Sequence, residues 1–341
     1  MPMLGIMASQ ISGHLSWTGN IVVGHATTPY ISAYPWSATG FGTKYSDPAT
    51  LPAGNGNAVT FNPAGNVLAV AHTTTPFVTA YPWSAGFGTK YANPATLPAG
   101  RGNGIAFSPS GADVIMATFN LTPFVAAYPW SSGFGTKYAN PATIASGAAR
   151  AAAFNPAGNV AAFSIAATPW VNAYGWSSGF GTKYSNPATI PTGDGYDVTF
   201  NNAGTVIGVA HSTSPYVSTY AWSSGFGSKY ADPASLPPGN STGIDFNSTD
   251  TTVVMSSTTT PYVFAYPWSS GFGTKYSDPA TLPTGGGNKA IFNPTGSLVG
   301  VAHNISPWIT VYPWTTASGF GTKYANPATT PPDEGLSVAF G

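Results

Sequence analysis

The chain has 341 residues, ten Lys and Arg against ten Asp and Glu, and no cysteine. This neutral composition offers no basic surface for nucleic acid or anionic lipid, and it excludes a disulfide framework and a thiolate metal site. No stretch approaches the roughly 18 consecutive apolar residues of a membrane helix, so membrane insertion is not expected.

Residues 1–18 precede the first repeat and are predicted to form an N-terminal arm or linker. From residue 19 to residue 341 one motif recurs seven times at steps of 46 or 47 residues: Tyr-Pro-Trp or a close variant, followed by Gly-Phe-Gly-(Thr/Ser)-Lys-Tyr. Such a period, filled with short strand-like runs, is typical of a β-propeller, in which each blade buries its apolar faces against neighbouring blades. The repeat tryptophans are Trp36, Trp83, Trp130, Trp176, Trp222, Trp268 and Trp314.

The second copy of the motif predicts how one blade is organised. Residues 57–61 and 67–72 are strand-like runs joined by Pro and Gly turn residues. Residues 77–83 form a third run, and Pro82 removes a ladder donor, which places this end near a sheet edge. A fourth short run is expected at residues 89–91, after Gly-Phe-Gly bends the chain. Each period therefore predicts a four-stranded blade.

The two ends of the chain carry complementary parts of a blade. Residues 336–341 match the first strand of a unit, and residues 19–25 match the second. The predicted fold is therefore all-β: a seven-bladed β-propeller of four-stranded blades, with the ring closed by pairing of the N- and C-terminal segments in one blade. Closure of this kind removes the open sheet edges.

Two features of the repeat resemble known families. Residues 61–65 (Phe-Asn-Pro-Ala-Gly) and 107–111 (Phe-Ser-Pro-Ser-Gly), each followed by a β run and a strand that ends in Trp, resemble the WD-repeat family. The third strand ends in Tyr-Pro-Trp rather than Trp-Asp, so the hydrogen-bond network of eukaryotic members is not expected. The shared tail Gly-Phe-Gly-Thr-Lys-Tyr-x-(Asp/Asn)-Pro-Ala resembles WD-like repeat proteins encoded by tailed bacteriophages. The resemblance covers residues 19–341 and implies a propeller from a phage.

Seven of the ten basic residues occupy one repeat position. A ring of ammonium groups could bind an anionic partner. However, an Asp or Asn lies three residues further on in every copy, and a lysine on an edge strand also blocks unwanted sheet pairing. A structural role is therefore favoured for Lys44, Lys90, Lys137, Lys183, Lys229, Lys275 and Lys323.

Two further repeat positions allow a functional and a structural interpretation. Four copies share a histidine where the other three have Phe119, Ile165 and Ser257, which favours a buried packing position over a metal ligand, and no metal site is predicted. The histidines are His25, His72, His211 and His303.

The aromatic residue after each Ser-Pro or Thr-Pro turn could stack on a sugar ring, but its unvaried aromatic character favours packing between sheets. These aromatics are Tyr30, Phe77, Phe124, Trp170, Tyr216, Tyr262 and Trp308.

The copies differ mainly in the loop before the first strand and in that strand itself. Most charges that do not belong to the repeat lie there, and the first strand of a propeller blade lines the central channel. We therefore predict a binding site at one rim of the channel. Its residues are Asn57, Arg101, Asn103, Arg150, Asp194, Tyr196, Asp197, Asp245, Lys289, Asp333 and Glu334.

The sequence predicts a non-enzymatic protein without a cofactor. No Ser-His-Asp set lies at plausible strand ends, and Asp194 with Asp197 is the pair that a propeller hydrolase or a Ca²⁺ site would use. The predicted function is a structural or attachment component of a bacteriophage virion, either a capsid decoration or a tail-associated propeller, that binds other virion proteins through one face. The alternative is a lectin-like propeller that binds a host cell-surface glycan. Both interpretations place the protein on a virion or outside the cell.

Overall fold

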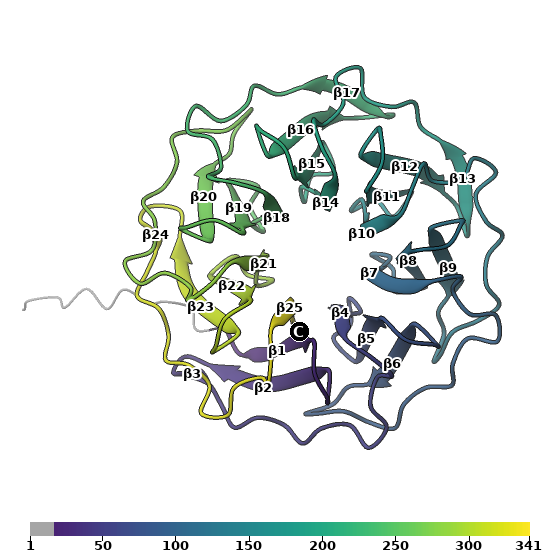
Figure 1. Ribbon diagram of the computed structural model, residues 1–341, viewed down its shortest axis with the longest axis horizontal. Helices are drawn as coiled ribbons and strands as arrows, with labels where there is room; N and C mark the ends of the chain where they lie inside the picture. Colours follow the sequence, from purple (N-terminus) through teal and green to yellow (C-terminus); the bar gives the residue numbers. More distant parts are fainter. Residues whose placement is uncertain (1–16) are drawn as a thin grey trace, which may run out of the picture.

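The computed structural model describes residues 17–341, and in these residues every regular element is a β-strand. None of them forms a helix that is long and apolar enough to span a membrane. The strands form seven antiparallel sheets, arranged as blades around a central channel (Figure 1). In each blade the first strand lies innermost and the later strands follow outward. The predicted fold class, an all-β seven-bladed propeller, is confirmed.

The blades are numbered here from the one that contains the N-terminal strand. Blade 1 consists of β25 (Gly335–Phe340), β1 (Gly19–His25), β2 (Ile31–Ser37) and β3 (Gly40–Phe41). Blade 2 consists of β4 (Gly56–Phe61), β5 (Val67–His72) and β6 (Val78–Pro82), and blade 3 of β7 (Arg101–Phe107), β8 (Asp113–Phe119) and β9 (Val125–Pro129). Blade 4 consists of β10 (Ala149–Phe154), β11 (Val160–Ile165), β12 (Val171–Trp176) and β13 (Phe180–Lys183).

The remaining three blades follow the same order outward from the channel. Blade 5 consists of β14 (Gly195–Phe200), β15 (Val206–His211), β16 (Val217–Trp222) and β17 (Phe226–Lys229). Blade 6 consists of β18 (Ser241–Phe246), β19 (Thr252–Ser257) and β20 (Val263–Pro267). Blade 7 consists of β21 (Gly287–Phe292), β22 (Leu298–His303), β23 (Ile309–Thr315) and β24 (Gly319–Phe320).

The outer strand of each blade differs from the prediction. Its pairing begins at the Phe of Gly-Phe-Gly, as in the Trp83–Phe87 bridge, and residues 89–91 form no strand in that blade but add the hydrogen bond from Tyr91 N to Ala80 O (2.9 Å). Among the described blades, a four-residue outer strand forms only in blades 4 and 5, where Gly175 and Ala221 replace the proline of Tyr-Pro-Trp. Proline has no N–H to donate to a ladder. In the other blades the outer pairing is therefore reduced to a two-residue strand or a single bridge.

The ring closes as the sequence predicted. In blade 1 the C-terminal strand β25 pairs antiparallel with β1, with Val22 opposite Ala339 and Val23 opposite Val338. The two chain ends thus complete one sheet, and the innermost ring of strands has no missing member (Figure 1). Most of the predicted N-terminal arm, residues 1–16, lies outside the described residues. Trp17, which is described, packs edge-to-face against Phe340 at a centroid distance of 5.3 Å.

The cores lie between neighbouring blades, and the repeat tryptophans pack there. Trp130 is 8% exposed and makes edge-to-face contacts with Tyr91 of blade 2 (5.2 Å) and with Phe107 and Phe134 of its own blade (5.5 and 4.9 Å). The same arrangement recurs in the other blades, for example between Tyr45 and Trp83 at 5.4 Å. The tail of each motif therefore joins its blade to the next one.

Replacing Trp130 by Ala is expected to lower the free energy of unfolding by about 3–5 kcal/mol, because the change leaves a cavity between two blades. Equilibrium denaturation in urea would measure this loss. Replacing the exposed Leu121 by Ala serves as a control, since this side chain is 58% exposed and should cost little. A loss below about 1 kcal/mol at Trp130 would contradict the assigned packing role.

The repeat lysines have the structural role that the sequence favoured. Each ammonium group donates to the Asp or Asn three residues further on, as in Lys44 with Asp47 and in Lys137 with Asn140 (2.6 Å). Equivalent contacts are made by Lys90, Lys183, Lys229, Lys275 and Lys323. The repeat lysines thus have hydrogen-bond partners within their own blade tails, three of them aspartates and four of them asparagines.

Candidate functional site

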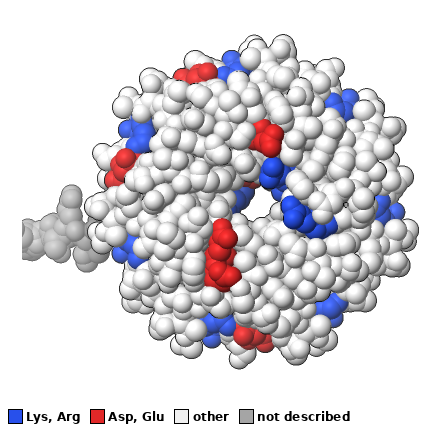
Figure 2. Space-filling model, in the orientation of Figure 1, with Lys and Arg blue, Asp and Glu red and all other residues white. Residues whose placement is uncertain are grey.

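The central channel opens on a face that we call the upper face, formed by the loops before the first strands and the loops between the second and third strands. Backbone hydrogen bonds join these two sets of loops, for example from Ser212 N to Asp194 O (3.0 Å). The first strands line a cavity of about 560 Å³ in the channel. This volume lies within the range of roughly 300–1,000 Å³ that is common for small-molecule sites. Acidic and basic groups gather at the channel mouth, whereas the remaining charges in view lie at the circumference (Figure 2).

Two arginines alternate with two aromatic rings at the upper end of the channel. The Cζ atom of Arg101 lies 4.3 Å from the centroid of the Phe119 ring. The Cζ atom of Arg150 lies 5.6 Å from the same ring and 4.7 Å from the Tyr196 ring. Cation–π contacts at these distances hold the planar guanidinium groups in position. We call these four residues the arginine stack.

The arginine stack carries more positive charge than its neighbours neutralise. Arg150 pairs with Asp194, with 3.3 Å between Nη2 and Oδ2. Among residues 17–341, no carboxylate lies within ion-pair distance of Arg101. Because guanidinium edges bind oxyanions in a planar, two-pronged geometry, this part of the mouth is suited to a carboxylate or a phosphate group.

Asp333 and Glu334 form a separate acidic sector of the mouth, in the loop before β25. The partly exposed Asp333 accepts hydrogen bonds from the Thr27 hydroxyl and from Glu334 N (2.8 Å), and the Thr27 contact holds the pKa of its carboxyl below the usual range. Glu334 Oε1 accepts from Asn288 Nδ2 at 2.8 Å. These contacts tie the acidic loop to blades 1 and 7.

The two predicted asparagines join neighbouring innermost strands. Asn57 Nδ2 donates to Gly102 O (2.8 Å) and to Asn103 Oδ1 (3.3 Å), and Asn103 Nδ2 donates to Ala149 O (3.4 Å). Thr242 makes the equivalent contact with Gly287 O in blade 6. The polar side chain at this repeat position therefore links the first strand of one blade to the next, so these asparagines have structural partners of their own.

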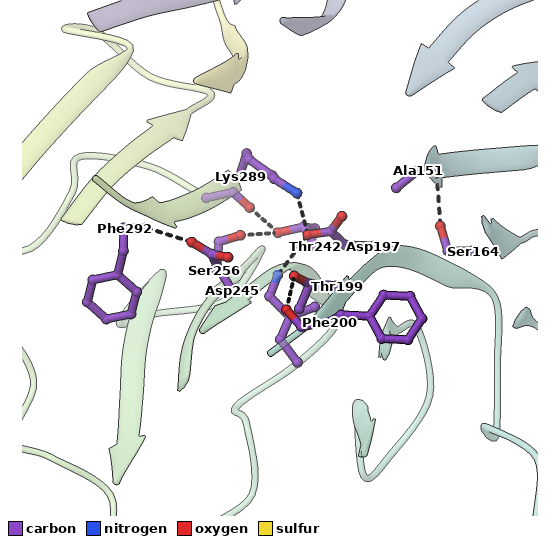
Figure 3. Close-up of polar contacts among 12 residues, drawn as sticks. Ala151, Ser164, Asp197, Thr199, Phe200, Thr242, Asp245, Ser256, Lys289 and Phe292 are labelled. Carbon is purple, nitrogen blue, oxygen red and sulfur yellow. Dashed lines mark hydrogen bonds and ion pairs between the residues drawn. The ribbon is translucent and has the colours of Figure 1, made fainter. Parts of the chain in front are cut away.

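Deeper in the channel, Asp197 and Lys289 form an ion pair that spans an intervening blade (Figure 3). Lys289 Nζ of blade 7 donates to Asp197 Oδ2 of blade 5 at 2.5 Å, and Ile244 N of blade 6 donates to the same oxygen at 2.9 Å. Asp197 is 2% exposed. The residue between them is Gly243, where an added Cβ would come within 3.2 Å of Lys289 Cα. The glycine in blade 6 therefore allows β18 to lie close to β21, the strand that carries Lys289.

Asp245 lies in the channel wall near this ion pair (Figure 3). Its Oδ2 atom accepts a hydrogen bond from Phe292 N at 2.8 Å. Burial, supplemented by the negative charge of Asp197, raises the pKa of this carboxyl to about 7, although the Phe292 N–H and Lys289 favour its charged form. A carboxyl that titrates near neutral pH can both accept and donate a proton under ordinary conditions. We call Asp197, Asp245 and Lys289 the channel cluster.

The histidines are buried and bonded, as the sequence favoured. All four are fully buried, and each Nε2 bonds the hydroxyl seven residues further on: Ser32, Thr79, Ser218 and Thr310. Burial lowers their pKa values to about 4. In the described residues, no group of three or more His, Asp or Glu side chains is arranged to hold a metal ion.

Sequence reasoning missed two residues of the site. Phe119 occupies the position that holds histidine in four other blades, and its ring forms the centre of the arginine stack. A phenylalanine where four blades have histidine, in the same blade as Arg101 and next to the blade of Arg150, was a signal that could have been read. Gly243 gave no such signal, because glycine also fills the same repeat position at Gly104.

Comparison with solved structures finds chains of similar fold, several of which have the names of enzymes. A Bacteroides fragilis protein named as a 6-phosphogluconolactonase has a TM-score of 0.76 and 14% identity, covering 95% of this chain and 98% of that one. The periplasmic gluconolactonase PpgL of Pseudomonas aeruginosa has a TM-score of 0.70 and 15% identity, covering 95% and 99%. Hydrazine synthase of Kuenenia stuttgartiensis has a TM-score of 0.62 and 14% identity, covering 86% and 96%. No family model and no curated protein matches the chain.

These findings correct the functional predictions from the sequence. Three of the similar structures carry the names of lactonases and none of these three is named as a virion protein, so the prediction of a non-enzymatic phage component, its lectin alternative and the virion or extracellular location are wrong. The physical reason is that the shared tail packs one blade on the next. A motif with this packing role indicates the fold and does not indicate which biological process the protein serves. Likewise, no WD-repeat relationship is found. At 13–15% identity the likeness establishes the fold alone. The predicted partners stay untested.

Proposed function

We propose that this protein hydrolyses a lactone, the internal ester of a hydroxy acid, inside its central channel. The observation that carries the proposal is Asp245, whose carboxyl has a pKa of about 7 and lies near cationic Lys289 in a cavity of about 560 Å³. The names of similar propellers favour a lactone over other esters. Because folds host many activities, the residues of the channel must carry the argument.

The channel cluster can supply both proton transfer and charge stabilisation. The Asp245 carboxylate accepts a proton from water as the water oxygen attacks the carbonyl carbon of the lactone. The Lys289 ammonium group, held by Asp197, stabilises the negative charge that develops on the carbonyl oxygen. The ring C–O bond then breaks, and Asp245 returns its proton to the leaving alkoxide oxygen. The products are the open hydroxy acid and the regenerated carboxylate.

The arginine stack would bind an anionic group at the other end of the substrate. Arg150 lies four residues before the end of β10, and Asp245 lies one residue before the end of the equivalent strand β18. Their levels in the channel therefore differ by three residues, or roughly 10 Å at about 3.3 Å per residue. This separation suits a sugar-acid lactone with a phosphate or carboxylate at its far end.

Replacing Asp245 by Asn should lower kcat by about 10²–10⁴-fold, because the amide cannot accept the proton of water. The amide oxygen can still accept the Phe292 N–H, so the fold should be kept. Acid release from a panel of aldonolactones, with and without phosphate and corrected for spontaneous hydrolysis, measures the rate. In the wild type, kcat/KM should rise with pH through about 7, as Asp245 loses its proton.

Asp278→Asn is the matched control, since this carboxylate lies at an exposed tail position paired with Lys275. It should leave the rate unchanged. The proposal fails if the wild type accelerates no lactone of the panel, or if the Asp245→Asn variant matches the wild type.

A further inference from the structure

Blade 4 has glycine at a position of the third strand where five blades have proline and blade 5 has alanine. Five blades have a proline before the repeat tryptophan: Pro35, Pro82, Pro129, Pro267 and Pro313. Each of these rings packs on a glycine of the outer segment. A Cβ added at Gly42, for example, would come within 2.7 Å of Pro35 Cγ, and one at Gly88 within 3.1 Å of Pro82 Cγ. Blade 4 has Gly175 instead, where an added Cβ would meet only Thr182 O, at 3.8 Å.

A hollow of about 530 Å³ lies where this ring is missing. Its lining includes Tyr138, Asn159, Gly175, Trp176, Phe180 and Gly181. Tyr138 comes from the tail of blade 3, and the other residues come from blade 4, so the hollow lies at the joint between two blades. It is formed by the turns opposite the upper face, away from the channel mouth.

The aromatic walls of the hollow are held in fixed orientations by Asp113. This carboxylate accepts hydrogen bonds from the Tyr138 hydroxyl (2.7 Å) and from Trp176 Nε1 (3.3 Å). Trp176 also makes edge-to-face contacts with Tyr138 at 5.5 Å and with Phe180 at 5.2 Å. Asp113 replaces the apolar residue that the neighbouring blades 2 and 4 have at the same place, Val67 and Val160. Blade 3, which adjoins the blade without the proline, thus supplies a carboxylate that holds the aromatic rings around the hollow.

We propose that this hollow binds a prolyl ring from a proline-rich segment of a partner protein. The chain's own proline rings fill the equivalent place in five blades, where each ring packs on the glycine that corresponds to Gly181. Grooves lined by Trp and Tyr are the usual receptors for proline-rich segments, which bind at low entropic cost because their extended helix is preformed. The lining carries no charged side chain, which suits the uncharged proline.

The experiment is a titration of ¹⁵N-labelled protein with a synthetic decaproline peptide, followed by NMR. The wild type should show saturable shifts at the Gly175 and Gly181 amides and at the Trp176 indole N–H. Gly175→Pro should weaken the apparent affinity at least tenfold, because the chain then fills the hollow itself. Ala221→Pro in blade 5 is the matched control and should bind like the wild type. A Gly-Ser peptide of equal length should cause no shifts.

The proposal would be overturned if decaproline caused no saturable shifts, or if Gly175→Pro bound as well as the wild type. Five blades already carry proline at this position, so the variant should fold, and a thermal melt checks this. If Gly175→Pro is unstable, Gly175→Leu provides a second test, because its side chain enters the same space. Equal binding by Gly175→Leu and the wild type would overturn the proposal. Shifts with the Gly-Ser peptide would also overturn it.

Discussion

Acidification from pH 7 to pH 4 should strongly reduce the free energy of unfolding, through the four buried histidines. Their pKa values fall from 6.5 to about 4 on folding, mainly because burial disfavours the charged ring. Between these values the unfolded chain binds protons that the folded chain does not bind, so stability falls as pH falls. Each histidine contributes about 3 kcal/mol to this loss. Urea denaturation at a series of pH values measures it.

Protonation of Asp245 should have the opposite effect and raise the free energy of unfolding as the pH falls. Its pKa is raised from 3.8 to about 7, so the folded chain binds a proton that the unfolded chain has lost, and this contribution to stability disappears as pH rises through about 7. One carboxyl opposes four histidines, so the net loss on acidification should remain. A flat stability profile between pH 7 and pH 4 would contradict the assigned burial of the histidines.

The double variant His72→Phe with Thr79→Ala measures how much one histidine contributes to the pH dependence of the free energy of unfolding. Blade 3 already carries this pair naturally, as Phe119 and Ala126, so the exchange has a precedent in the same fold. The variant should lose about 3 kcal/mol less than the wild type between pH 7 and pH 4. The single change Thr79→Ala is the control, because it leaves the buried ring in place and should keep most of the pH dependence.

Deletion of residues 335–341 should abolish cooperative folding of the ring. The deletion removes β25, leaves one edge of β1 unpaired and takes Val338 and Phe340 out of the core between blades 7 and 1. Loss of one large buried side chain alone costs about 3–5 kcal/mol, so the loss of a whole strand should exceed the stability of most domains. Circular dichroism melting and gel filtration of the truncated chain measure the outcome.

Leu336→Ser is the control for this deletion, because it keeps the strand and changes only a half-buried side chain. It should melt close to the wild type. A truncated chain that melts cooperatively within a few degrees of the full chain would show that the ring does not depend on its closing strand.

Much of the fold followed from the sequence because the repeat is physically informative. A blade cannot bury its own faces, so seven copies at a constant step require a closed array, and the split match of the two ends located the joint. The outer strands were misplaced because their pairing depends on the proline before each tryptophan. Where Gly175 and Ala221 replace it, the strand lengthens. The link between each histidine and the hydroxyl seven residues later was also present in the sequence, but its meaning required the cross-strand geometry.

The predicted binding site at the channel rim stays a prediction, and the structure adds how its residues lie relative to one another. Non-repeated charges marked the channel rim, and the structure places Arg101 and Arg150 there beside Tyr196. The pairing of Asp197 with Lys289 could not be read, since 92 residues and one blade separate them. The raised pKa of Asp245 likewise depends on the atoms that surround it.

By itself, the sequence determined the ring, its closure and the face on which the blades differ, because periodicity and the placement of scarce charges are properties of the chain order. Only the tertiary structure decided which charges meet, which carboxyl titrates near neutral pH and where a missing proline leaves a hollow. Coulombic interaction and desolvation act through distance in space, and the closed ring brings residues from separate blades within a few ångströms of one another.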